Sequence, residues 1–368
     1  MIKIAQFASY DTNVGDSIAI RNIRRRINKL SRNEIRWSSC DLNVGHKKRN
    51  NIEFCKEAFK RLSDDSDMLI IGGGGLIEAE PRMDTGWKLP FNEEILDVIE
   101  IPIVCFSVGI NYFRGFRELK TEKELGLLKT LVDRSALFSV RNDGSKEIID
   151  DIMLSQGIVV EDKIREIPDP GLIHDFESDV RHVISDGVFQ PVWNNKETIM
   201  SGRKMTGENL LRIRHVADLF DMDIMPHTKK DFSFYPTANT DRYSVAVGKF
   251  KERAEYSQFM SFIHKYFNYD YTVSMRGHGQ LISIGLNIPS IYFSTQDKLL
   301  RFSQKNGFED YNIDIEEEEW DKKLIEKIIL LKEGGPYKER WHEIRNEKMK
   351  LFKSQYDMFC LDTLALIK

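Results

Sequence analysis

The chain alternates short apolar runs with segments of helical spacing. Residues 67–77, 101–110 and 136–141 are mostly apolar or glycine without polar alternation, which is typical of parallel strands covered on both faces. Residues 2–8 alternate or run apolar and predict a first strand. Helical segments follow these runs at intervals of about 30 residues, the length of a strand–helix unit. The first half of the chain therefore predicts a doubly wound parallel sheet.

The second half of the chain continues this alternation. Its predicted strands are at residues 187–193, from 223 to near His227, and at 244–247. Its predicted helices are an amphipathic helix at 207–220, an aromatic-rich helix at 256–271, a helix with an acidic first turn at 316–331 and a last helix at about 338–364.

A segment rich in proline separates the two halves. Residues 167–173, Ile-Pro-Asp-Pro-Gly-Leu-Ile, interrupt the helical texture and predict a short strand followed by an exit from the first domain. A chain of 368 residues also exceeds what one hydrophobic core usually serves. We therefore expect domains at residues 1–178 and 183–335, closed by a helix within 336–368.

The stretch from Thr272 to Phe293 contains the main candidate site. It predicts a strand tip at Tyr271–Met275, a turn at Arg276–Gly279, a short helix at Gln280–Gly285 and a strand at Ser290–Phe293. The first amides of a helix lack intrahelical partners, and the helix dipole is positive at that end. Such a unit can bind an anion.

Arg276 and His278 lie at this predicted helix start. The guanidinium of arginine offers a planar fork to a phosphate or carboxylate, and histidine adds a donor or a proton near neutral pH. Gly277 and Gly279 let a ligand approach the backbone closely. A solvent-facing loop of ordinary polar residues is the alternative interpretation.

A turn near the N-terminus supplies candidates for the facing side of a cleft. Residues 11–16 contain Asn13, Gly15 and Asp16, and Asp16 can be the N-cap of a helix from about Ser17 to Leu30. A cap and a glycine turn explain these residues without a ligand. A substrate-lining role is equally compatible with the pattern.

Further candidates lie at predicted strand ends. Gly73 and Gly74 follow a buried strand at the edge where ligands collect in open α/β sheets. Arg141 also ends a strand, and a salt bridge that holds the next turn is favoured over direct ligand contact. His227 follows Pro226 at another strand end, where a capping role and a donor-binding role are both open.

Composition narrows the classes of function. The net charge of -4 and the pI of about 6.1 argue against a general nucleic-acid binder, so an anionic substrate needs local cations. No apolar run approaches the roughly 20 residues that cross a bilayer, and the start lacks a signal-peptide pattern. Four cysteines without a C-x-x-C pair favour reduced thiols in a cytoplasmic setting; they are Cys40, Cys55, Cys105 and Cys360.

Seven short motifs together resemble the polysaccharide pyruvyl transferase family from about residue 11 to 310. The R-x-H element followed by G-x-x-x-P is the most specific of them. The motifs are Asn13-Val-Gly-Asp16, Gly72–Gly75, Ser107-Val-Gly109, Ser139-Val-Arg141, Asp169-Pro170, Pro226-His227 with Asp231, and Arg276-Gly-His278 followed by Gly285 and Pro289.

The resemblance implies an α/β fold with two Rossmann-like domains that face a cleft, as in glycosyltransferase-B-like proteins. It also implies transfer of a pyruvyl group from phosphoenolpyruvate to two sugar hydroxyls of a cell-surface or capsular polysaccharide precursor, which forms a ketal. This chemistry is met by a cationic clamp and a proton donor, without a metal or organic cofactor. The expected partners are the donor and a glycan or lipid-linked glycan; assembly into a homo-oligomer is left open.

The resemblance places Arg276 and His278 at the phosphoenolpyruvate site, and we divide the remaining candidates into a donor side and an acceptor side. His278 is the expected general acid or phosphate donor, and Asp16 is a candidate acceptor for a hydroxyl proton. The expected donor-binding residues are Arg276, Gly277, His278, Gly279 and His227. The expected acceptor or cleft-lining residues are Asn13, Gly15, Gly73, Gly74 and Arg141.

Two other functions remain open from the sequence. A nucleotide-sugar glycosyltransferase of the same architecture would use Arg276, His278 and the helix amides to hold a diphosphate. A non-catalytic glycan-binding protein would instead use Trp87, Trp193 and several tyrosines as a sugar platform. Release of phosphate, release of a nucleoside diphosphate, or binding without turnover would distinguish the three.

Overall fold

The structure is a computed structural model. It describes residues 1–10, 14–42, 54–78, 85, 87–111, 121–160, 163–174, 185–190, 207–225, 227 and 262–367.

The first sheet has six parallel strands. Their spatial order is β2 (Ile35–Asp41), β1 (Ile2–Ala8), β3 (Met68–Glu78), β4 (Ile103–Asn111), β5 (Leu137–Arg141) and β6 (Ile164–Ile167). The strand order reverses between β1 and β3, and ligands in doubly wound sheets bind beyond the carboxyl ends of the strands at such a point. The predicted doubly wound parallel sheet is therefore confirmed.

Both faces of this sheet are covered, which explains its continuous apolar strands. Ile70 and Phe106 point into a cluster shared with α1 (Val14–Leu30) and α13 (Gly335–Ala365), whereas Ile71 and Cys105 join a cluster on the other face. The helices of that other face are α3 (Lys56–Asp65), α4 (Glu93–Asp97), α5 (Glu122–Arg134) and α6 (Ser145–Leu154). Successive residues of a strand point to opposite faces, so each strand feeds both clusters.

The second sheet is also parallel and has the same kind of order. In space it runs β11 (Asn312–Asp314), β10 (Ser290–Ser294), β9 (Tyr269–Ser274), β7 (Ser185–Gln190) and β8 (Asp223–Ile224). Its helices are α8 (Gly207–Leu219), α10 (Gly277–Gly285), α11 (Asp297–Asn306) and α12 (Trp320–Glu333), with a 3-10 turn η5 (Glu309–Tyr311). The order again reverses, here between β7 and β9.

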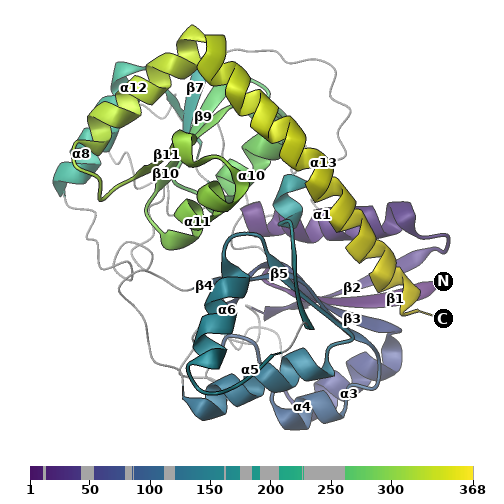
Figure 1. The fold of residues 1–368 in the computed structure, drawn as a ribbon. Coiled ribbons are helices and arrows are strands. Elements are labelled where there is room, and N and C mark those ends of the chain that lie inside the picture. The colour runs from purple at the N-terminus through teal and green to yellow at the C-terminus, as the bar shows by residue number, and fades with distance from the viewer. Residues whose placement is uncertain are drawn as a thin grey trace.

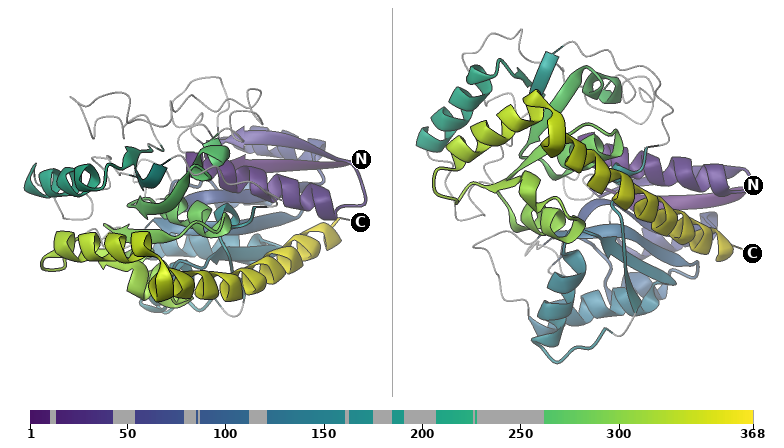
Figure 2. Two further views of the ribbon diagram at one scale, coloured as in Figure 1. Left: turned by 90° about the horizontal axis from the view of Figure 1, so that it is seen from above. Right: turned by 45° about the horizontal axis from the view of Figure 1, so that its top comes forward.

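Helix α13 connects the two halves of the molecule. Figure 1 shows it leaving the second sheet's layer and crossing to the first sheet, where the two chain ends lie close together. Both views of Figure 2 show the same crossing. Trp341 near its start packs on Phe308, and Tyr356 and Phe359 near its end pack edge-on against Phe106 of β4. The helix therefore fixes the relative position of the two sheets.

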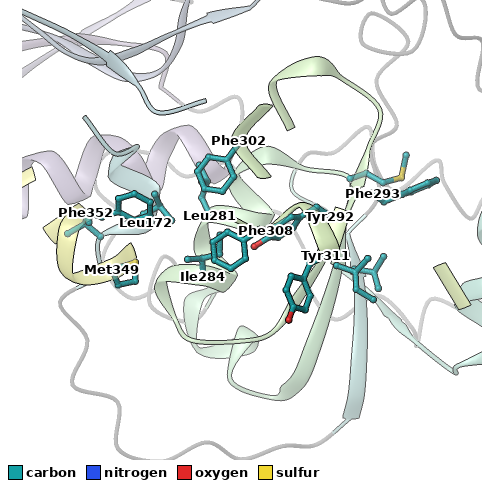
Figure 3. Close-up of a cluster of buried hydrophobic side chains, with 14 of the residues drawn as sticks. Leu172, Leu281, Ile284, Tyr292, Phe293, Phe302, Phe308, Tyr311, Met349 and Phe352 are labelled. Atoms are coloured by element: carbon teal, nitrogen blue, oxygen red, sulfur yellow. The ribbon is translucent and has the colours of Figure 1, made fainter. Parts of the chain in front are cut away.

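Apolar packing also joins the halves behind the site. Leu172, in the 3-10 turn η2 (Pro170–Leu172), belongs to the same buried cluster as Leu281 and Ile284 of α10 and Met349 and Phe352 of α13. Figure 3 shows these side chains next to the ring-rich core of the second half. Helix α10 is therefore embedded between elements from both halves of the chain.

Several predicted bounds were wrong. The helix expected at 256–271 ends by residue 266, since Tyr269 already belongs to β9; the acidic run 316–319 precedes α12, which begins at Trp320. Strand β2 and helix α11 were not predicted. The domain boundary expected at 178–183 and the strand at 244–247 lie outside the described residues.

Among the described residues, no helix has the length and apolar character needed to cross a membrane.

Candidate functional site

Helix α10 begins earlier than predicted. Arg276 is its N-cap residue, with extended backbone, and Gly277, His278 and Gly279 form its first turn instead of a separate loop. The hydroxyl of Ser274 accepts a hydrogen bond from the Arg276 amide at 3.1 Å, which stabilises the passage from β9 into the helix. Arg276 and His278 are almost fully buried, so the solvent-facing loop interpretation was wrong.

His278 lies between two carboxylates from the other half of the chain. Its Nδ1 is 3.6 Å from Oδ1 of Asp16 on α1, and its Nε2 is 3.7 Å from Oδ2 of Asp169, which caps η2. These are ion-pair distances, longer than a direct hydrogen bond. A ring placed between two acids can take up and release a proton with a partner on either side.

Glycines allow this close approach. A β-carbon on Gly15 would lie 2.2 Å from Cγ of His278, and one on Gly171 would lie 3.2 Å from its Cδ2. Gly74 adopts a φ of +158° and lies against Asp16, whose Oδ1 would be 2.9 Å from an added β-carbon. Gly73, with a φ of +103°, lies against Ile20 of α1. An added β-carbon at position 15 would therefore collide with the ring and one at position 73 with Ile20, so the packing of α1 requires these two glycines.

Arg141 pairs with Asp169, which lies beside the histidine, and with Asp143. Its guanidinium lies 3.2 Å from Asp169 and 3.0 Å from Asp143, and it occupies the space above Gly109, where a β-carbon would lie 1.9 Å from it. Burial alone would lower the pKa of Arg141, but the nearby carboxylates, Asp143 first, outweigh burial and raise it. The salt-bridge role favoured for Arg141 is thus confirmed.

Asp16 is the more exposed of the two acids beside the ring, with a side chain 18% exposed against 3% for Asp169. It lies in the first turn of α1, which begins at Val14, so the prediction that Asp16 is the N-cap was wrong. Burial raises the pKa of Asp16, while the charges of His278, Arg141 and Lys88 oppose that rise. A carboxylate with a raised pKa is better suited to accept a proton.

This raised pKa predicts how the Asp16→Asn variant changes stability with pH. The folded state binds the proton of Asp16 more tightly than the unfolded chain does. The stabilisation from this proton is present below the pKa of Asp16 in the unfolded chain and is lost as pH rises through its pKa in the folded state. We expect Asp16→Asn to be more stable than the wild type at neutral pH, with a difference that shrinks toward about pH 4. Urea denaturation across this range measures it; a variant less stable at neutral pH would contradict the expectation.

Arg276 and His227 form the inner side of the site. His227 is fully buried, with its Nε2 3.0 Å from the hydroxyl of Tyr266 and its ring edge-on to Phe262. Burial, with Arg276 and His278 nearby, holds the pKa of His227 well below its usual range. Its carbonyl also accepts a hydrogen bond from the Val14 amide at 3.4 Å. These are the contacts of a neutral core histidine, and donor binding by His227 stays a prediction.

The structure brings most of the candidates together. Gly15, Asp16, Gly74 and Arg141 meet His278 or its acidic partners, whereas Asn13 lies outside the described residues. Asp169 belongs to one of the seven motifs but was not predicted as a site residue. The signal that could have identified it is an aspartate before a proline at the carboxyl end of a strand, where an N-cap at a sheet's ligand-binding edge is expected.

The site joins the carboxyl ends of strands from two parallel sheets, an arrangement that defines a glycosyltransferase-B-like protein. S. aureus MnaA, solved with UDP, aligns with a TM-score of 0.51 at 12% identity over 94% of this chain and 91% of that one. A putative UDP-N-acetylglucosamine 2-epimerase from Listeria monocytogenes aligns with a TM-score of 0.51 at 10% identity over 96% of each chain. These likenesses show the fold.

The sequence itself identifies the family. The family model for polysaccharide pyruvyl transferase matches residues 13–297, which include α1, both aspartates beside the ring and the whole of α10. The chain belongs to the polysaccharide pyruvyl transferase family. No curated protein matches the sequence.

Proposed function

We propose that this protein transfers the pyruvyl group of phosphoenolpyruvate to two hydroxyls of one sugar in a polysaccharide precursor, in the cytoplasm. Family membership supports a transferase of this kind. The observation that carries the proposal is the imidazole of His278, which stands between Asp16 and Asp169 at the start of α10. A group that can transfer a proton therefore lies beside a helix end that can bind an anion.

The reaction needs two proton movements. The methylene carbon of phosphoenolpyruvate gains a proton and becomes a methyl group, the bond from the central carbon to the phosphate oxygen breaks, and two bonds to sugar oxygens form. The two hydroxyls release two protons, of which one balances the methyl proton and one leaves with phosphate. The central carbon becomes cationic in between, and preorganised polar groups stabilise such charge most effectively.

The described residues fit these needs in distinct roles. Arg276 and the first amides of α10 hold the phosphate or the carboxylate of the donor, because a helix start binds anions. His278 delivers the proton to the methylene carbon. Asp16, whose pKa burial raises, accepts a proton from a sugar hydroxyl.

Incubation of the purified protein with phosphoenolpyruvate and candidate glycan precursors tests the proposal. We expect inorganic phosphate release that depends on the acceptor, together with the mass increase of a pyruvate ketal on the glycan. A parallel incubation with nucleotide sugars should release no nucleoside diphosphate. Nucleoside diphosphate release without phosphate release would replace the proposal by a nucleotide-sugar glycosyltransferase; glycan binding without turnover would indicate a non-catalytic protein.

A further inference from the structure

Of the two acids that lie beside His278 among the described residues, Asp169 is the less exposed and makes several further contacts. Its Oδ1 accepts a hydrogen bond from the Gly171 amide at 2.7 Å, and its own amide donates to Oδ1 of Asn142 at 3.3 Å. Its Oδ2 lies 3.2 Å from Arg141 and 3.7 Å from Nε2 of His278. One oxygen of this carboxylate therefore fixes the turn, and the other lies between a guanidinium and an imidazole.

The segment before Asp169 is also fixed. Ser107, at a positive φ of 50° in β4, donates a hydrogen bond to the carbonyl of Pro168 at 3.2 Å, and its amide donates to the hydroxyl of Ser139 at 2.8 Å. Asn22 of α1 donates to the carbonyl of Pro170 at 2.8 Å. The backbone on both sides of Asp169 is thus tied to the first sheet and to α1.

The two edges of the imidazole have different surroundings. Nε2 is buried without a hydrogen-bond partner among the described residues, and the nearest carboxylate to it is the 3%-exposed Asp169. Nδ1 faces Asp16, whose side chain is 18% exposed. The Nδ1 edge therefore faces the more exposed of the two acids.

We propose that Asp169 is a positioning residue for His278: its carboxylate orients the ring and keeps a proton on Nε2, so that Nδ1 is the nitrogen that exchanges protons. The charged ring releases its Nδ1 proton to the methylene carbon and remains as the neutral ring protonated on Nε2. A sugar hydroxyl proton, received directly or through Asp16, restores the charged ring. A carboxylate beside one ring nitrogen sets the tautomer in this way. The catalytic part of this inference rests on the proposed function.

Among the described residues, the charged groups closest to the ring come from several different elements. Asp16 comes from α1, Asp169 from the start of η2, Arg141 from the end of β5, and Arg276 and the buried His227 from the second half. Of these groups, only Asp169 lies beside Nε2 and is also held in place through its amide and both of its carboxylate oxygens. Removal of the charge of Asp169 should therefore change which ring nitrogen of His278 carries the proton, without moving the backbone.

The Asp169→Asn variant tests the inference, because its side-chain oxygen can still accept from the Gly171 amide. Nitrogen NMR of the labelled, substrate-free protein, with the signal assigned by its loss in His278→Gln, reports the ring tautomer. We expect the proton of the neutral ring to leave Nε2 in the variant. We also expect kcat to fall by about 10- to 100-fold with little change in KM for phosphoenolpyruvate.

Asp143→Asn is the matched control, because Asp143 also pairs with Arg141, at 3.0 Å, but no contact joins it to His278 among the described residues. We expect this variant to keep the wild-type tautomer and kcat. An unchanged tautomer in Asp169→Asn, or an equal loss of kcat in Asp143→Asn, would overturn the inference. If the wild type releases no phosphate from phosphoenolpyruvate, the proposed function fails, while the tautomer measurement still decides the role of Asp169.

Discussion

Replacement of His278 by glutamine is expected to lower kcat for phosphate release from phosphoenolpyruvate by about 10²- to 10⁴-fold, the usual contribution of a general acid or base. Glutamine approximates the size of the ring and retains hydrogen-bonding groups, but it cannot carry a proton between the donor and Asp16. The anion-binding amides of α10 and Arg276 remain in place. KM for phosphoenolpyruvate should therefore change much less than kcat, which steady-state kinetics measures.

His215→Gln is the control for this variant, because His215 is exposed on α8. Its kinetics and thermal midpoint should equal those of the wild type. The midpoint of His278→Gln should also lie close to the wild-type value, since glutamine approximates the size of the ring and the ring makes no direct hydrogen bond to its acids, which lie 3.6 and 3.7 Å away. Normal turnover in His278→Gln would remove His278 from the chemistry.

The features that were predicted correctly depend on local patterns. The continuous apolar runs predicted β3, β4 and β5, because both faces of the first sheet are covered by helices. The strand–helix–strand unit around Arg276 and His278 was likewise predicted from the glycines and the apolar runs on each side of them. Arg141 as a salt-bridge partner followed from its place at a strand end.

The features that were missed depend on contacts between distant segments. Strand β2 has an alternating, half-buried pattern at the sheet edge, so it lacks the apolar run that marks the inner strands. Helix α10 begins at Gly277 although glycine is a poor helix former, because its first turn packs against α1 and η2. The pairing of Asp169 with His278 has no local signal, since it arises only when the two sheets are held together.

Helix α10 is fixed at both ends. At its carboxyl end, Arg345 of α13 donates to the carbonyls of Ile284 and Gly285 at 2.9 and 3.0 Å. Gly285 also lies against the carbonyl of Leu172, where an added β-carbon would be 2.5 Å away. At its amino end, the ring of His278 lies directly on Gly15 of α1. A helix held in this way cannot shift to accommodate a larger residue at either contact.

Replacement of Gly15 by alanine is therefore expected to impair both stability and transfer. Gly15 lies in α1, so its backbone is already suitable for alanine, and the added methyl group would lie 2.2 Å from Cβ and Cγ of His278. We expect a loss of about 1–3 kcal/mol in the free energy of unfolding, as for other overpacked contacts. We also expect kcat to fall by about 10²-fold, because displacement of a catalytic group by about 1 Å has that effect.

Gly126→Ala is the matched control, since Gly126 lies within α5 and an added β-carbon meets nothing within 4 Å. It should raise the free energy of unfolding by about 0.5–1 kcal/mol, the helix preference of alanine over glycine, and leave kcat unchanged. Urea denaturation and phosphate release measure both variants. If Gly15→Ala instead matched Gly126→Ala in both measurements, the contact between α1 and the imidazole would not exist in solution, and Asp16 would not be adjacent to the ring.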